Sequence, residues 1–99
     1  MSEMLTPRVT NTTLTDANTE YSLVLTGSCR FVTFQCRTAF DVRYAFVTGK
    51  VATPTAPYMT LKSGGVYSSP EKLEVPLGGL TLYLASAQAA VVVEVTEWY

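Results

Sequence analysis

The sequence predicts an all-β fold: an antiparallel β-sandwich, of jelly-roll or immunoglobulin-like type, with about seven or eight short strands. Three observations favour this class. Apolar and polar residues alternate along most of the chain, as they do in strands that bury one face. Turn-forming residues recur about every ten residues, a spacing typical of sandwiches and barrels. No segment keeps the periodicity of an amphipathic helix.

The clearest strand signals lie near the C-terminus. Residues 80–84 place their leucines on one face, and residues 91–95 place alternate valines on one face. β-branched and aromatic content favours strand over helix in both runs. We interpret the two runs as a β-hairpin around the small, polar segment 85–90, and we expect the earlier strands to pack on it.

The other expected strands precede this pair. They cover residues 20–26, 29–37, 41–48, 58–62, 66–67 and 71–77. Residues 49–57 contain Pro54 and Pro57 and carry no strand signal, so we predict a surface loop there. Alternation within the strands predicts a core that contains Val32, Phe34, Val42, Tyr44, Phe46, Leu73, Val75, Leu82, Val93 and Val95.

The chain is expected to divide into residues 1–18, an extended N-terminal arm, and residues 19–99, the β-sandwich domain. The arm is rich in threonine and asparagine, and Pro7 restricts it to an edge position. Because the arm has few apolar residues to bury, we expect it to lie extended on a neighbouring subunit. There it would add main-chain hydrogen bonds as an extra strand.

Composition favours a protein that hides surface in an assembly. The charged share is 15%, below the roughly 25% of an average soluble protein, while the hydrophobic share is 47%. The net charge is −1 and the basic residues are scattered, so nucleic-acid binding is not expected. We find no secretory signal pattern and no apolar run long enough to span a bilayer, so we expect no membrane partner.

The two cysteines, Cys29 and Cys36, are separated by an odd number of positions. On one continuous strand they would face opposite sides, so a disulfide between them would need a bulge or a turn. We predict that both are reduced and unpaired, as in proteins made in a reducing cytoplasm. Cys36 would share a face with Val32 and Phe34 and act as a small hydrophobe.

The sequence offers no recognisable catalytic apparatus. It contains no histidine, the commonest general base and metal ligand. Two cysteines without a CxxC pair do not make a zinc site, and no Asp-rich loop is present for calcium. The acidic residues read as solvated strand charges rather than as a pair across a cleft. We therefore expect no enzymatic activity, no catalytic or metal-binding residues and no cofactor.

Four stretches of the sequence together resemble a known group of proteins. They are residues 14–22, 41–46, 58–67 and 80–98, which include Asp16-Ala17-Asn18-Thr19 in the first stretch and Trp98 in the last. The chain resembles small virion structural proteins encoded near the head genes of tailed bacteriophages. The resemblance implies a non-enzymatic capsid decoration (cement) or neck component. Its partners would be the major capsid or neck proteins and copies of itself. Its location would be the virion, after synthesis in the cytoplasm of the bacterial host.

Aromatic residues that fall on outward strand faces or at the chain end are the candidate interface. They are Phe31, Tyr83, Trp98 and Tyr99. An alternative hypothesis is a carbohydrate- or receptor-binding module of a phage fibre or tail. In that module Tyr58 and Tyr67 would join Phe31, Tyr83 and Trp98 in stacking on sugar rings.

Overall fold

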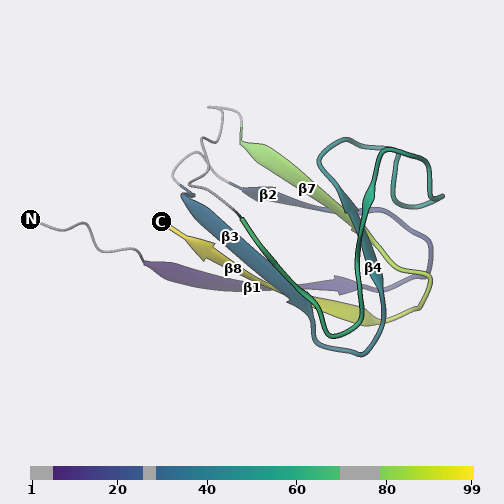
Figure 1. Ribbon diagram of the computed structural model, residues 1–99, viewed down its shortest axis with the longest axis horizontal. Helices are drawn as coiled ribbons and strands as arrows, with labels where there is room; N and C mark the ends of the chain where they lie inside the picture. Colours follow the sequence, from purple (N-terminus) through teal and green to yellow (C-terminus); the bar gives the residue numbers. More distant parts are fainter. Residues whose placement is uncertain (1–5, 26–28, 70–78) are drawn as a thin grey trace, which may run out of the picture.

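The structure, a computed structural model, describes residues 6–25, 29–69 and 79–99 (Figure 1). The described residues form strands joined by turns and loops, and none of them is helical. The strands are β1 (Pro7–Leu14), β2 (Tyr21–Leu25), β3 (Phe31–Cys36), β4 (Val42–Ala45), β5 (Met59–Leu61), β6 (Val66–Ser68), β7 (Leu80–Ala85) and β8 (Val91–Trp98).

The strands form two four-stranded antiparallel sheets that pack face to face (Figure 1). Sheet A has the order β1-β8-β3-β6, and sheet B has the order β2-β7-β4-β5. Among the strands described, only β4 and β5 are neighbours both in sequence and in a sheet. Apolar side chains from both sheets form one main buried cluster. The predicted antiparallel β-sandwich is therefore confirmed.

The predicted C-terminal hairpin is wrong, because β7 and β8 lie in different sheets. β7 pairs with β2 and β4 in sheet B, and β8 pairs with β1 and β3 in sheet A. The segment between them crosses from one sheet to the other beside the connection from β1 to β2. The amide of Asn18 donates to the carbonyl of Ser86 at 2.7 Å, and that of Ala90 donates to the carbonyl of Thr15 at 3.1 Å. Alternation specifies which face of a strand is buried, but not which strand lies beside it.

The N-terminal segment also differs from expectation. Residues 7–14 form β1, which pairs along its whole length with β8 of the same chain, so they belong to the sandwich itself. Leu14 is fully buried in the core. Because main-chain hydrogen bonds fix a strand in a sheet, the segment can join its own domain with few apolar side chains. The edge position predicted from Pro7 is confirmed.

Most of the predicted core is buried. Confirmed are Val32, Phe34, Val42, Tyr44, Leu82, Val93 and Val95, whereas Leu73 and Val75 lie outside the described residues. Phe46 was predicted wrongly, since its side chain is 41% exposed. β4 ends at Ala45, and beyond the end of a strand the alternation no longer sets the direction of a side chain.

Three aromatic rings lie at the centre of the sandwich. The ring of Phe34 stacks on that of Tyr67 with centroids 4.6 Å apart, and it meets the ring of Tyr44 edge-on at 5.1 Å. Tyr44 and Tyr67 also contact each other edge-on at 5.4 Å. Burial, followed by the nearby Tyr67, raises the pKa of the Tyr44 phenol. This cluster joins β3 and β6 of sheet A to β4 of sheet B.

The cysteines are unpaired, as predicted, but they do not face opposite sides. Cys29 precedes β3 and is buried in the main core, and Cys36, the last residue of β3, packs against the same core. The expectation of opposite faces assumed one continuous strand from Cys29 onward. Burial, followed by the charge of Glu97, raises the pKa of the Cys29 thiol.

We expect alkylation of the folded protein to modify Cys36 faster than Cys29, because the thiolate is the reactive form and Cys29 is buried with a raised pKa. Denaturation without reductant should then expose both thiols to alkylation. Mass spectrometry after each step counts the labels. An unfolded chain that takes up no label would contradict the assignment of free thiols.

Candidate functional site

The structure brings together two of the four candidate interface residues. Phe31 in β3 and Trp98 in β8 are register partners, and both side chains are half-buried on the outer face of sheet A. Together with Thr33 and Ser68 they line a shallow hollow. We call these four residues the sheet A platform. It offers two aromatic side chains with two hydroxyl groups beside them.

The other two candidates lie elsewhere. Tyr83 in β7 belongs to sheet B, where it packs against a small cluster of Ala45, Val51 and Ala85. Tyr99 packs against the main core, and its hydroxyl donates a hydrogen bond to the carboxylate of Glu97. The four aromatic residues therefore do not form one surface.

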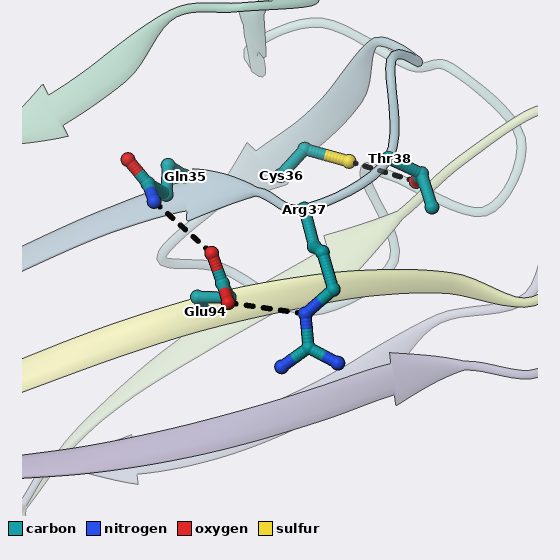
Figure 2. Close-up of polar contacts among 5 residues, drawn as sticks. All are labelled: Gln35, Cys36, Arg37, Thr38 and Glu94. Carbon is teal, nitrogen blue, oxygen red and sulfur yellow. Dashed lines mark hydrogen bonds and ion pairs between the residues drawn. The ribbon is translucent and has the colours of Figure 1, made fainter.

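A polar network lies next to the sheet A platform on the outer face of sheet A. Figure 2 shows the side chains of Gln35 and Arg37 pointing toward Glu94 from either side. Gln35 Nε2 donates to Glu94 Oε1 at 3.0 Å, and Arg37 Nε donates to Glu94 Oε2 at 3.0 Å. These hydrogen bonds, first that from Gln35 and then that from Arg37, hold the pKa of the Glu94 carboxyl below its ordinary value of 4.5.

Register places this network in line with the aromatic pair. Along the paired strands β3 and β8, the facing residues are Gln35 with Glu94, then Thr33 with Thr96, then Phe31 with Trp98. A second shallow hollow lies over the middle of this series and reaches Val66. The outer face of sheet A thus changes from charged and amide groups, through hydroxyl groups, to aromatic rings.

Sequence reasoning missed an apolar surface at the end of β4 and the start of β5. Phe46, Val47, Pro57, Tyr58 and Met59 line a hollow there, together with residues of β4. We call these five residues the β4–β5 patch. Val47 and Met59 are more than half exposed, and Phe46 and Tyr58 are also accessible. A contiguous apolar surface of this kind is typical of a contact site.

Two charged side chains anchor the loop that contributes to the β4–β5 patch. Arg43 Nε donates to the carbonyl of Val51 at 2.7 Å, and its Nη2 donates to that of Ala52 at 3.2 Å. Glu20 accepts hydrogen bonds from the Thr48 hydroxyl at 2.7 Å and from the Gly49 amide at 2.8 Å. The predicted surface loop at residues 49–57 is confirmed, and these contacts give it a defined position.

Hydrogen bonds within the chain also fix the carboxylates of Glu97 and Asp41. Glu97 is buried and accepts hydrogen bonds from the hydroxyls of Tyr99 and Thr10. Hydrogen bonds from the Ser63 amide and then from Lys62 lower the pKa of the Asp41 carboxyl. Across the described ranges, no three metal-ligating side chains lie close enough together to hold an ion. The same ranges contain no helix that could cross a bilayer.

Comparison of the chain with protein-family models, with curated proteins and with solved structures gives no match. The surfaces described above and the resemblance seen in the sequence are therefore the basis for a functional proposal.

Proposed function

We propose that this chain is a non-enzymatic structural component of a tailed-bacteriophage particle, a capsid decoration (cement) or neck protein that acts through subunit contacts. The resemblance in the sequence supports a tailed-bacteriophage particle as the assembly. The observation that carries the contact role is the β4–β5 patch, which leaves several large apolar side chains accessible on a small chain. Burial of such side chains against a larger protein would contribute binding free energy in proportion to the apolar area covered.

The position of the β4–β5 patch suits this role. It lies at the end of β4 and on β5, the edge strand of sheet B, so a partner can reach it without disturbing the core. The anchored loop fixes one side of it, so little conformational entropy is lost when a partner binds. A preformed, accessible apolar surface of this kind supports a contact role.

A charge in the β4–β5 patch is expected to weaken assembly. Met59→Lys places an ammonium group at a site that is 61% exposed in the free chain, so the fold should tolerate it. In a contact the same group would be buried without a partner, and incorporation into particles should fall about tenfold or more. Quantitative mass spectrometry of particles assembled with the variant provides the measurement.

The matched control is Val66→Lys, because Val66 is also 61% exposed but lies on β6, the edge of the other sheet. We expect this variant to enter particles as the unchanged chain does. Equal incorporation of the two lysine variants and the unchanged chain would contradict a contact at the β4–β5 patch.

The sheet A platform favours a second candidate function, a carbohydrate- or receptor-binding module. Aromatic faces stack on sugar rings, and the hydroxyl and carboxylate groups that follow along the same face could bind sugar hydroxyls. Of the other aromatic residues considered for such a site, Tyr67 packs in the core and Tyr58 lies in the β4–β5 patch. Glycan-array binding that is lost in Trp98→Ala and kept in Tyr83→Ala would favour this candidate.

A further inference from the structure

Strand β1 forms a long edge of sheet A (Figure 1). It has eight residues, and its register with β8 runs without a bulge from Pro7 to Leu14. Exposed edges of this kind are usually blunted by lysines, prolines or bulges, because they otherwise pair with other strands. In β1 such features are confined to the start, at Pro7 and Arg8. Residues 9–14 are uncharged and contain no proline.

The register shows which main-chain groups this edge presents. Thr6 and Tyr99 exchange both main-chain hydrogen bonds, at 2.8 and 3.0 Å. In an antiparallel pair such residues alternate with residues whose N–H and C=O point away from the partner strand. Val9, Asn11 and Thr13 are therefore the residues whose amide and carbonyl groups point away from β8. No strand among those described pairs with this side of β1.

We propose that β1 pairs with β1 of a second copy of this chain, antiparallel about a two-fold axis at Asn11, which joins the two A sheets into one. The inference deepens the assembly proposal and rests on it for its biological role, since a strand-paired dimer is one of the self-contacts that an assembly protein uses. Its physical basis is independent of any particle.

Hydrogen bonding favours this register over one shifted toward the start of β1. With Asn11 opposite Asn11 of the second copy, Val9 lies opposite Thr13, and the three outward amides of each copy all find carbonyl acceptors. A register centred on Thr10 would place Pro7 opposite Thr13. Proline has no amide hydrogen, so the Thr13 carbonyl would then lack a donor. The register centred on Asn11 leaves Pro7 outside the pairing.

Side chains in this register are self-complementary. On the outer face the two Asn11 side chains meet, and amide groups can both donate and accept hydrogen bonds. On the core-side face Thr10 meets Thr12 of the second copy, a favourable cross-strand pair. Arg8, the only charged residue of β1, lies opposite Leu14, and the two Arg8 residues are roughly 20 Å apart. A second copy therefore meets no like-charge repulsion along the strand.

The test compares Asn11→Pro with Asn11→Thr and with the unchanged chain. Proline at position 11 removes an outward amide, and the strand already accepts proline at an outward position of the same parity, Pro7. Threonine keeps the amide. Sedimentation equilibrium from micromolar to millimolar concentration measures the mass. We expect the unchanged chain and Asn11→Thr to reach twice the monomer mass, and Asn11→Pro to dimerise at least tenfold more weakly.

Hydrogen exchange followed by NMR supplies a second readout on the unchanged chain. The amides of Val9, Asn11 and Thr13 should gain protection as the concentration rises, whereas those of Thr10 and Thr12 should be protected throughout. An unchanged chain that stays monomeric overturns the proposal, and so does exchange at these three amides that is independent of concentration. If such a chain still enters particles at a fixed copy number, the strand-paired dimer is excluded and the virion proposal is unaffected.

Discussion

Replacing Phe34 with alanine is expected to lower the free energy of unfolding by roughly 3–5 kcal/mol, the usual cost of removing a large buried aromatic side chain. Phe34 is only 1% exposed, and its ring contacts those of Tyr44 and Tyr67. The truncation would leave a cavity between the two sheets, because the neighbouring rings belong to paired strands and can relax only in part. Urea-induced unfolding followed by tryptophan fluorescence provides the free energy.

Phe40→Ala is the matched control for this prediction. Phe40 is 42% exposed and lies between β3 and β4, so the same truncation there should change the free energy of unfolding by about 1 kcal/mol or less. A Phe34→Ala chain whose melting temperature falls by about one degree or less would show that Phe34 is not part of the core.

Deleting residues 1–12 is expected to abolish cooperative folding. The deletion removes most of β1, so it strips β8 of one neighbouring strand and opens the core beside Val91, Val93 and Val95. β8 is the central partner of both β1 and β3, and its exposed edge would then carry unpaired main-chain groups. Circular dichroism during heating should show the loss of the sharp transition of the unchanged chain.

A shorter deletion, of residues 1–5, leaves β1 intact and serves as the control. We expect its thermal transition to match that of the unchanged chain. A chain without residues 1–12 that melts at the same temperature as the unchanged chain would show that β1 is dispensable for the domain. The segment would then again be the external arm that the composition first indicated.

Local alternation predicted the buried faces of β2, β3, β7 and β8 well. Val93 and Val95, for example, were placed in the core because they share one face of a strongly alternating run, and burial of one strand face is a local property. The choice of partner strand is not local. The residues that link β7 and β8 could equally close a hairpin or cross between sheets, and the bonds that decide it reach Thr15 and Asn18 far away in the chain.

The candidate site was predictable only in part. Phe31 and Trp98 were identified singly as outward aromatic residues, but their pairing depends on the register between β3 and β8, which the sequence does not encode locally. One feature of the sequence does indicate the β4–β5 patch. Three apolar residues in succession, Ala45, Phe46 and Val47, break the alternation of β4, so at least one of them had to leave the core face.

Strand β1 shows a different limit of prediction from the sequence. Its threonines and asparagine make it look too polar to fold against its own domain, and the core-facing side of β1 ends in a single fully buried residue, Leu14. Main-chain hydrogen bonds to β8 do not depend on side-chain type, so composition underestimates them. The threonines and the asparagine are polar but uncharged, and the proposed pairing of two copies depends on this uncharged edge.

The number of copies of this chain in purified phage particles tests the central proposal most directly. A decoration or neck protein is present at a fixed ratio to the major capsid protein, because each copy occupies a site repeated by the symmetry of the particle. Quantitative mass spectrometry of gradient-purified particles, together with a cryo-EM map that locates an added tag, gives both the ratio and the position. We predict a constant ratio across preparations and density at the capsid surface or neck. Absence of the chain from purified particles would contradict the proposal.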